Sequence, residues 1–232
     1  MDHTASDPEA RLERPSRPVL IVCGLLVVLL SAGLVLSRAG RSADPSRQPA
    51  ARGRVLAVLR SALYGVALSP DGRIAAVVGD SPHICLLDAD TGVRLAEVRT
   101  PSPGLRCVGW SADGAFLVAG GRDGLLHWVH GTTLQGAVPA HRGIINRLAV
   151  SPDSRHVLTA GFDGTVGLWS AADRGLCRRY DVPPLGAAAV AIAPDGKSAL
   201  VGGFRTIRRI DLETGKVVEV GDHDNWILTV AA

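Results

Sequence analysis

Short apolar runs separated by polar turns form the dominant pattern from residue 54 to the end of the chain. The clearest stretch lies between Ala140 and Asp181, where four runs rich in β-branched and aliphatic residues alternate with breaks containing Pro, Asp, Ser and Gly. Runs of about four to eight such residues between turn residues are typical of β-strands. The stretch lacks the 3.6-residue period of an amphipathic helix. It therefore predicts a unit of four antiparallel strands.

One turn recurs through the chain at nearly constant spacing. Its second position is usually Pro, which fixes φ for a type I turn, and its third is Asp, which bonds back to the local backbone. Successive copies are 42, 40 and 42 residues apart, and a period of about 40–45 residues with four strands per unit is typical of propeller blades. The four copies are Ser69-Pro70-Asp71-Gly72, Ser111-Ala112-Asp113-Gly114, Ser151-Pro152-Asp153-Ser154 and Ala193-Pro194-Asp195-Gly196. The spacing predicts an all-β propeller with blades over residues 64–98, 105–138, 144–180 and 187–220.

Both ends of the repeat region, residues 54–232, carry strand-like segments beyond these four units. Segment 54–60 is apolar and would serve as the outermost strand of a last blade. At the other end, residues 223–230 repeat residues 141–148 at an offset of 82, which predicts that a fifth blade begins at Trp226. Propellers contain about four to eight complete blades. We therefore expect an incomplete propeller, in a fragment of a longer chain or, if the chain is naturally this short, in a homo-oligomer that covers its open strand edges.

The N-terminal region has a different pattern, with one long apolar run. Residues 1–18 are polar and are expected to form a disordered tail. Val19–Leu36 is 18 residues without a charge, and as a helix it would span about 27 Å, close to the hydrocarbon core of a bilayer. The run predicts a single-pass transmembrane helix that serves as a signal anchor; a cleaved signal peptide and a buried soluble helix are the alternatives. Residues 37–53 predict a linker, and the arginines on both sides of the run leave the orientation in the membrane open.

The third unit carries His141 before its first strand, Thr159 in the second, Asp163 in the following turn and Trp169 at the end of the third. In these residues it resembles a WD-repeat, which has His, Ser or Thr, Asp and Trp at the same places. The resemblance implies that these four side chains form a structural hydrogen-bond network. A histidine buried between strands must bond through both ring nitrogens, and an Asp in a tight turn can accept one of those bonds. The His, Thr and Asp superficially resemble a catalytic triad, but the resemblance implies a structural function for them.

The other units match this pattern less completely. In the third unit itself, Ser170 stands where the repeat usually has Asp after its Trp, and the full set of four residues occurs in no other unit. The chain therefore resembles the bacterial type of WD-repeat protein, with degenerate repeats. A looser relationship, to propellers whose blades end in Asp-x-x-Thr-Gly, is an open alternative, because two units contain this pattern at residues 88–92 and 211–215.

Composition and the remaining polar groups exclude several kinds of chemistry. The formal net charge of +3 is too small to indicate a nucleic-acid partner. The four cysteines show no Cys-x-x-Cys spacing, so neither a zinc site nor a redox pair is indicated. His127 and His130 would lie on opposite faces of a strand, which disfavours a shared metal, and Asp88 and Asp90 lack the other ligands of a calcium loop. No catalytic, cofactor-binding or metal-binding residue is therefore predicted.

Two functions are compatible with these features. The resemblance implies a membrane-anchored, non-catalytic scaffold that binds protein partners, and it does not indicate which partners. The alternative is a ligand-sensing or substrate-platform propeller in a larger protein, enzymatic or not, of which this chain is a fragment.

Overall fold

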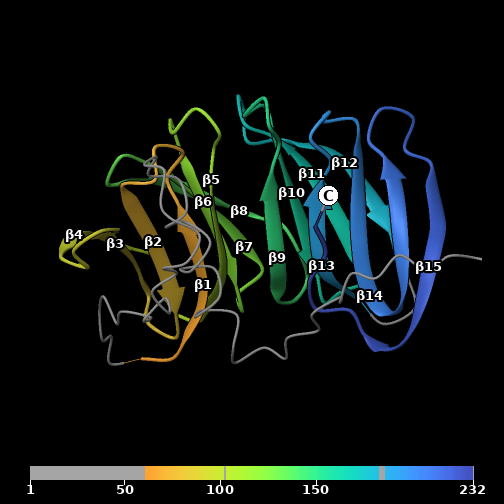
Figure 1. The fold of residues 1–232 in the computed structure, drawn as a ribbon, viewed down its shortest axis with the longest axis horizontal. Coiled ribbons are helices and arrows are strands. Elements are labelled where there is room, and N and C mark those ends of the chain that lie inside the picture. Colours follow the sequence, from red (N-terminus) through yellow and green to blue (C-terminus); the bar gives the residue numbers. More distant parts are fainter. Residues whose placement is uncertain (1–60, 102, 183–185, 232) are drawn as a thin grey trace, which may run out of the picture.

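The structure is a computed structural model that describes residues 61–101, 103–182 and 186–231. Every regular element in these residues is a β-strand, and the strands form four antiparallel sheets that follow one another in chain order (Figure 1). The predicted all-β class and its four-stranded antiparallel units are confirmed. The predicted tail, transmembrane helix, linker and closing strand 54–60 lie outside the described residues. Within the described part, no helix is long and apolar enough to cross a bilayer.

Each sheet is one blade, in which strands pair in chain order. The first blade contains β1 (Leu63–Leu68), β2 (Ile74–Gly79), β3 (His83–Asp88) and β4 (Arg94–Arg99). The second contains β5 (Leu105–Trp110), β6 (Leu117–Gly121), β7 (Leu125–His130) and β8 (Thr133–Pro139). The third contains β9 (Ile145–Val150), β10 (His156–Gly161), β11 (Thr165–Ser170) and β12 (Leu176–Asp181). The fourth contains β13 (Ala187–Ile192), β14 (Ser198–Asp211) and β15 (Val217–Trp226).

The 14-residue strand β14 folds back on itself. A straight strand of that length would span about 45 Å, yet the Leu212 amide donates to the Lys197 carbonyl oxygen at 2.9 Å, so the two ends of β14 lie together. The reversal falls near Arg205, whose φ is 65°. The first half of β14 pairs with β13 and the second half with β15. The fourth blade therefore has four strand segments, like the other three.

The recurring turn is stabilised by its own Ser and Asp side chains. In the third blade Ser151 Oγ accepts from the His156 amide at 2.9 Å, and Asp153 Oδ1 accepts from the Arg155 amide at 3.0 Å. The bond from the Ser151 hydroxyl, followed by the bond from the Arg155 amide, lowers the pKa of Asp153. Ser154, at a φ of 61°, stands where the other three copies have Gly at positive φ. All of these bonds are local, so the copies with Ser can form the same turn from their own residues, and the fourth copy, with Ala193 in place of Ser, keeps the bond from the Lys197 amide to Asp195 Oδ1 at 2.9 Å.

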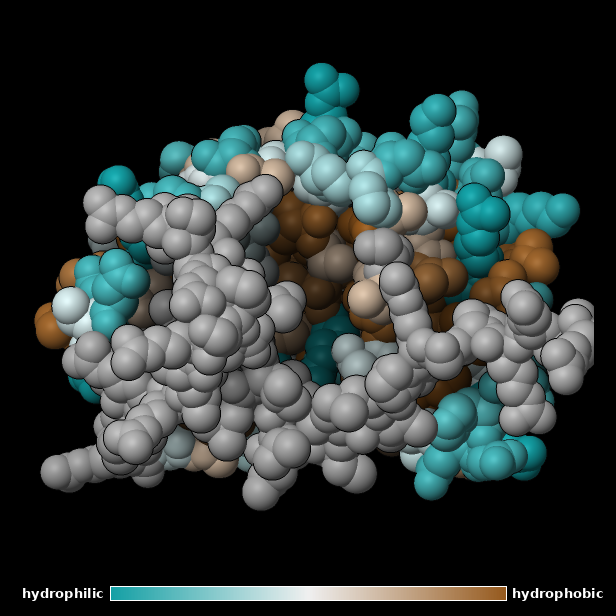
Figure 2. All heavy atoms as spheres, viewed as in Figure 1, coloured by the Kyte–Doolittle hydropathy of each residue, from teal (hydrophilic) through white to brown (hydrophobic). Residues whose placement is uncertain are grey.

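Apolar side chains on both faces of the sheets pack consecutive blades against each other. Val78 and Ile84 of the first blade form a core with Leu105 of the second. Trp128 and Ile145 belong to the core shared by the second and third blades, and a further core joins the third blade to the fourth. Figure 2 shows apolar residues gathered in the middle of one face, with hydrophilic residues along its upper margin. Burial between neighbouring blades therefore holds the stack together.

The segment after β15 contacts the last blade as an inner strand contacts the blade before it. An added Cβ at Gly120 in the second blade would lie 2.9 Å from Ile145, the first residue of the third blade. An added Cβ at Gly202 in the fourth blade would lie 2.7 Å from Cγ2 of Ile227. Residues 227–231 are not assigned to a strand. The fifth blade that we expect to begin at Trp226 stays a prediction, and the Ile227 contact favours it.

Candidate functional site

The third blade contains a chain of hydrogen-bonded side chains. The Trp169 Nε1–H donates to Thr159 Oγ1 at 2.9 Å, and this hydroxyl oxygen lies 2.8 Å from His141 Nε2. His141 Nδ1 lies 3.0 Å from Asp163 Oδ1. Because the ionised Asp163 carboxylate can only accept, Nδ1 carries the ring hydrogen and donates it to Asp163, so Nε2 of the neutral ring accepts from the Thr159 hydroxyl. The structure brings together the four residues that the sequence pointed to, and it adds Thr165, whose hydroxyl donates to Asp163 Oδ1 at 2.8 Å.

Burial favours the neutral form of the histidine in this network. The side chain of His141 is 0% exposed, and burial lowers its pKa against the opposing hydrogen bond and charge of Asp163. Burial acts to raise the pKa of Asp163, but bonds from the Arg142 amide, Thr165 and His141 outweigh it, so the pKa is lowered. A neutral imidazole beside an ionised carboxylate agrees with the tautomer that the hydrogen bonds assign. Because both ring nitrogens are bonded, neither is free to accept a proton from a substrate.

A glycine makes room for the Trp169 side chain. Gly167 is the cross-strand neighbour of Thr159 in the β10–β11 pair. An added Cβ at Gly167 would lie 2.7 Å from Trp169 Nε1 and 3.1 Å from Thr159 Oγ1. The indole therefore reaches the hydroxyl through space that any other residue type at position 167 would fill.

The second blade has a different arrangement at the equivalent place. His127 is the cross-strand neighbour of Ala119, as Gly167 is of Thr159 in the third blade. Its Nε2 lies 3.3 Å from Oδ2 of the turn residue Asp123, and its Nδ1 is buried without a hydrogen-bond partner in the described part of the chain. Burial lowers the pKa of His127 against the opposing charge of Asp123. The turn Asp of this blade is thus bonded by a histidine of the third strand instead of one from the preceding loop.

Three aromatic side chains meet at the ends of the third and fourth blades. The Phe162 ring stacks on the Trp226 ring with centroids 6.2 Å apart and an interplanar angle of 15°. Phe204 meets the same indole edge-on at 5.5 Å. Phe162 is 58% exposed. Sequence reasoning missed this cluster, although a signal was present: both Phe residues follow Gly in the same turn of successive blades, where polar residues are usual.

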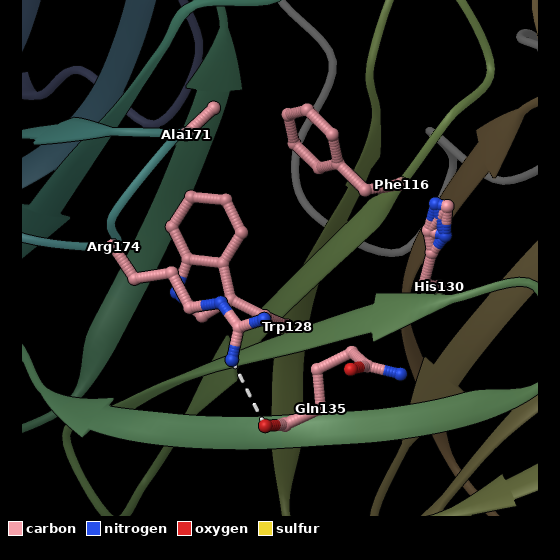
Figure 3. A pocket seen from close by; sticks show the side chains of 6 residues that line it. All are labelled: Phe116, Trp128, His130, Gln135, Ala171 and Arg174. Atoms are coloured by element: carbon pink, nitrogen blue, oxygen red, sulfur yellow. Dashed lines mark hydrogen bonds between the residues drawn. The ribbon is translucent and has the colours of Figure 1, made fainter.

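A cavity of about 380 Å³ lies between the second and third blades. It is near the other end of the strands, because Phe116 lies in the turn after the first strand of the second blade, and Ala171 and Arg174 lie in the turn after the third strand of the third blade. The side chains that line it are Phe116, Trp128, His130, Gln135, Ala171 and Arg174 (Figure 3). No sequence pattern indicates this site, because its residues come from separate turns and strands of two blades.

The sequence also matches known proteins. The profile of the family described as WD domain, G-beta repeat matches residues 92–128 and 132–170. The second match includes all four residues of the network in the third blade. The chain therefore contains two WD repeats. Each matched repeat begins just before the outermost strand of one blade, β4 or β8, and ends in the third strand of the next blade. Each repeat therefore joins two blades.

Several curated WD-repeat relatives are much longer than this protein. It is 29% identical over 169 residues to Protein groucho of Drosophila melanogaster, a match covering 72% of this chain and 18% of that protein. It is 26% identical over 162 residues to Angio-associated migratory cell protein of Homo sapiens, covering 69% and 37%. It is 31% identical over 143 residues to Telomerase protein component 1 of Rattus norvegicus, covering 59% and 5%. The chain therefore spans well under half the length of each.

Proposed function

We propose that this WD-repeat protein is a membrane-anchored, non-catalytic scaffold that binds protein partners through exposed loops. The observation that carries this proposal is the exposed ring of Phe162, stacked on Trp226 and adjoined by Phe204. Exposed aromatic residues that form a contiguous cluster are typical of protein-binding surfaces. Here the rings lie on neighbouring blades whose packed cores fix the spacing of the turns.

Two further features support the non-catalytic and membrane-anchored parts of the proposal. The sequence indicated one arrangement of His, Asp and a hydroxyl group, at His141. This histidine is buried and hydrogen-bonded at both ring nitrogens, which suits a structural function in the third blade. Membrane attachment is assigned to Val19–Leu36 on its length and lack of charge.

A second candidate function is a ligand-sensing or substrate-platform domain of a larger protein. The cavity between the second and third blades favours it, because about 380 Å³ falls within the range of small-molecule pockets, which is roughly 300–1,000 Å³. The two candidates differ in what binds and where. The scaffold binds a protein at the Phe162 cluster, whereas the sensor binds a small molecule in the cavity.

Affinity purification with the tagged full-length chain from detergent-solubilised membranes tests the scaffold. Phe162→Ser removes the exposed ring, and Val93→Ser is the matched control, since Val93 is an apolar turn residue of the first blade that is 60% exposed. Recovery of defined partners should fall by about tenfold or more with the Phe162→Ser bait, as expected for loss of an interface anchor, and should be unchanged with the control. Recovery of the same proteins by all three baits would contradict the proposal. A ligand-induced rise in melting temperature without any enriched protein would favour the sensor.

Alkaline extraction of membranes tests the anchor. The full-length protein should stay in the pellet, and Leu26→Arg together with Leu29→Arg should release it, because charges at the centre of a span cost about 2.5–3.5 kcal/mol each on insertion scales. The conservative pair Leu26→Val and Leu29→Val should stay in the pellet. The intact mass separates the alternatives: 24.2 kDa corresponds to the whole sequence, and loss of the residues up to the end of the apolar run would indicate a cleaved signal peptide.

A further inference from the structure

One wall of the cavity between the second and third blades is aromatic and rigid. The rings of Phe116 and Trp128 have centroids 5.4 Å apart and are tilted by 44°. Trp128 is 3% exposed and belongs to the core that joins the two blades, so its ring is held in place. Phe116 and Ala171 both pack against the core that contains Trp128, and Figure 3 shows them above the Trp128 ring, with Gln135 below it. This wall suits a flat or branched apolar side chain.

The rest of the lining is polar and offers more hydrogen-bond donors than acceptors. Arg174 has five N–H donors, and one nitrogen, Nη1, donates to the Gln135 carbonyl oxygen at 2.9 Å (Figure 3). The indole N–H of Trp128, on the Arg174 side of its ring, is buried without an acceptor in the described part of the chain. His130 and the Gln135 side chain complete the lining, which contains no carboxylate. A ligand with an anionic hydrogen-bond acceptor would match this polar part of the lining.

The backbone places Arg174 where it is. Its φ is 62°, a conformation that Gly or Asn adopts more readily than Arg. The turn is closed by the Arg174 amide, which donates to the Ser170 carbonyl oxygen at 2.9 Å, and by the Gly175 amide, which donates to Asp173 Oδ1 at 3.0 Å. Within the described residues Arg174 forms no ion pair. An arginine without an ion pair, at a turn position that suits smaller residues, indicates that its side chain has a binding function.

We propose that this cavity binds an acidic peptide segment of a protein partner, with an aromatic side chain against Phe116 and Trp128 and a neighbouring carboxylate on Arg174. The inference rests on the proposed scaffold function and adds a second contact site, away from the Phe162 cluster. A volume of about 380 Å³ is enough for one large side chain and an adjoining carboxylate. The ring would bury apolar area against a wall that is already packed, and the guanidinium would form an ion pair with the peptide carboxylate, for which the lining has no acidic partner of its own.

Calorimetric titration of the full-length protein in detergent with three short peptides tests the proposal. The probe is acetyl-Glu-Glu-Phe-Glu-Glu-amide, and the comparison peptides replace either its Phe with Ala or its four Glu with Lys. The probe should bind saturably with a Kd below about 1 mM, and both comparison peptides should bind at least about tenfold more weakly. Equal binding of all three peptides, or no binding of the probe, would overturn the proposal.

Two matched variants locate the binding. Arg174→Gln should weaken binding of the probe by about tenfold or more, because it removes the charge that faces the cavity. Arg155→Gln should leave binding unchanged, since Arg155 is an exposed arginine of a nearby turn in the same blade and does not line the cavity. An equal effect of the two variants would show a general charge effect and overturn the site.

Two further outcomes separate this inference from the functions on which it rests. If 3-phenylpropionate alone binds as tightly as the peptide, the cavity is a small-molecule site and the peptide proposal fails. If the probe does not bind but Phe162→Ser still abolishes recovery of partners, the scaffold function stands and the assignment of this cavity fails.

Discussion

His141 Nε2 lies 2.8 Å from Thr159 Oγ1, which also accepts the indole N–H of Trp169 at 2.9 Å. The contact links the loop before the third blade to the middle of that blade's second strand. Both side chains are buried, so neither group could recover its lost hydrogen bond from water if its partner were removed. The network is therefore expected to stabilise the third blade as a unit.

Replacing Thr159 by Val should destabilise the protein. The two side chains have nearly the same shape, so the change removes the hydroxyl without leaving a cavity, and it leaves Trp169 Nε1 and His141 Nε2 without partners. A buried polar group left unsatisfied costs about 1–3 kcal/mol. Urea denaturation should show a loss of unfolding free energy in that range. Thr133→Val, at an exposed position in β8, should change it by no more than about 0.5 kcal/mol; a similar loss in both variants would contradict the prediction.

Replacing Gly167 by Ala should displace the Trp169 indole. The new Cβ would lie 2.7 Å from Trp169 Nε1, which is closer than real Cβ contacts come. Overpacking of this kind costs about 1–3 kcal/mol. Near-ultraviolet circular dichroism should show a changed tryptophan signal, and thermal unfolding should show a lower Tm. The control is Gly143→Ala, where nothing lies within 4 Å of the added Cβ; an unchanged spectrum and Tm in Gly167→Ala would show that the network is not packed as described.

Stability should fall as the pH is lowered from 7.5 to 5.5. Burial lowers the pKa of both His127 and His141 below the ordinary value of about 6.5. In this range the histidines of the unfolded chain bind protons that those of the folded chain do not. The free energy of unfolding is therefore highest above the unfolded-state pKa and decreases as the pH falls below that value. Asp163, whose pKa is lowered, contributes in a separate window below about pH 4. Urea midpoints measured across the pH range should therefore decrease from 7.5 to 5.5.

Variants without the two buried imidazoles test the source of this pH dependence. The double substitution His127→Gln and His141→Gln should lower stability at pH 7.5 and should remove most of the further loss at pH 5.5, because glutamine does not titrate. His130→Gln, at an exposed position, should keep the wild-type pH dependence. If the double variant loses as much stability between the two pH values as the wild type, other groups are responsible.

The parts of the fold that sequence could predict are those formed by local bonds. Ser151 and Asp153 bond to amides within five residues of themselves, so the turn is visible as a short motif, and its spacing gives the blade length. The network at His141 could also be predicted, because the third blade resembles a WD-repeat, and the resemblance implies a hydrogen-bond network among these four positions. The reversal inside β14 was harder to place, since Phe204 and Arg205 stand where the third blade has the Asp and Gly of its turn.

The surfaces could not be predicted, because they depend on how blades meet. Phe162 and Trp226 are far apart in the sequence and come together only through the packing of the third blade on the fourth. In the same way the cavity arises where Arg174 of the third blade comes close to Gln135 of the second. Arg174 and Gln135 are ordinary residue types for a turn and an exposed strand, so no local pattern indicates the cavity, and the Phe residues after Gly give no sign that they meet Trp226.

Replacing Ile227 by Ala tests whether the chain beyond β15 begins another inner strand. Ile227 packs on Gly202 as Ile145 packs on Gly120, with an added Cβ falling 2.7 Å and 2.9 Å away in the two places. Ile227 is partly buried, whereas the next residue, Leu228, is 48% exposed. Ile227→Ala should therefore cost about 1–2 kcal/mol, below the full cost of truncating a core residue, and Leu228→Ala should cost no more than about 0.5 kcal/mol. Urea denaturation of the two variants measures the difference. An equal and small effect would mean that this segment does not pack on the fourth blade, and the fifth blade would lose its structural support.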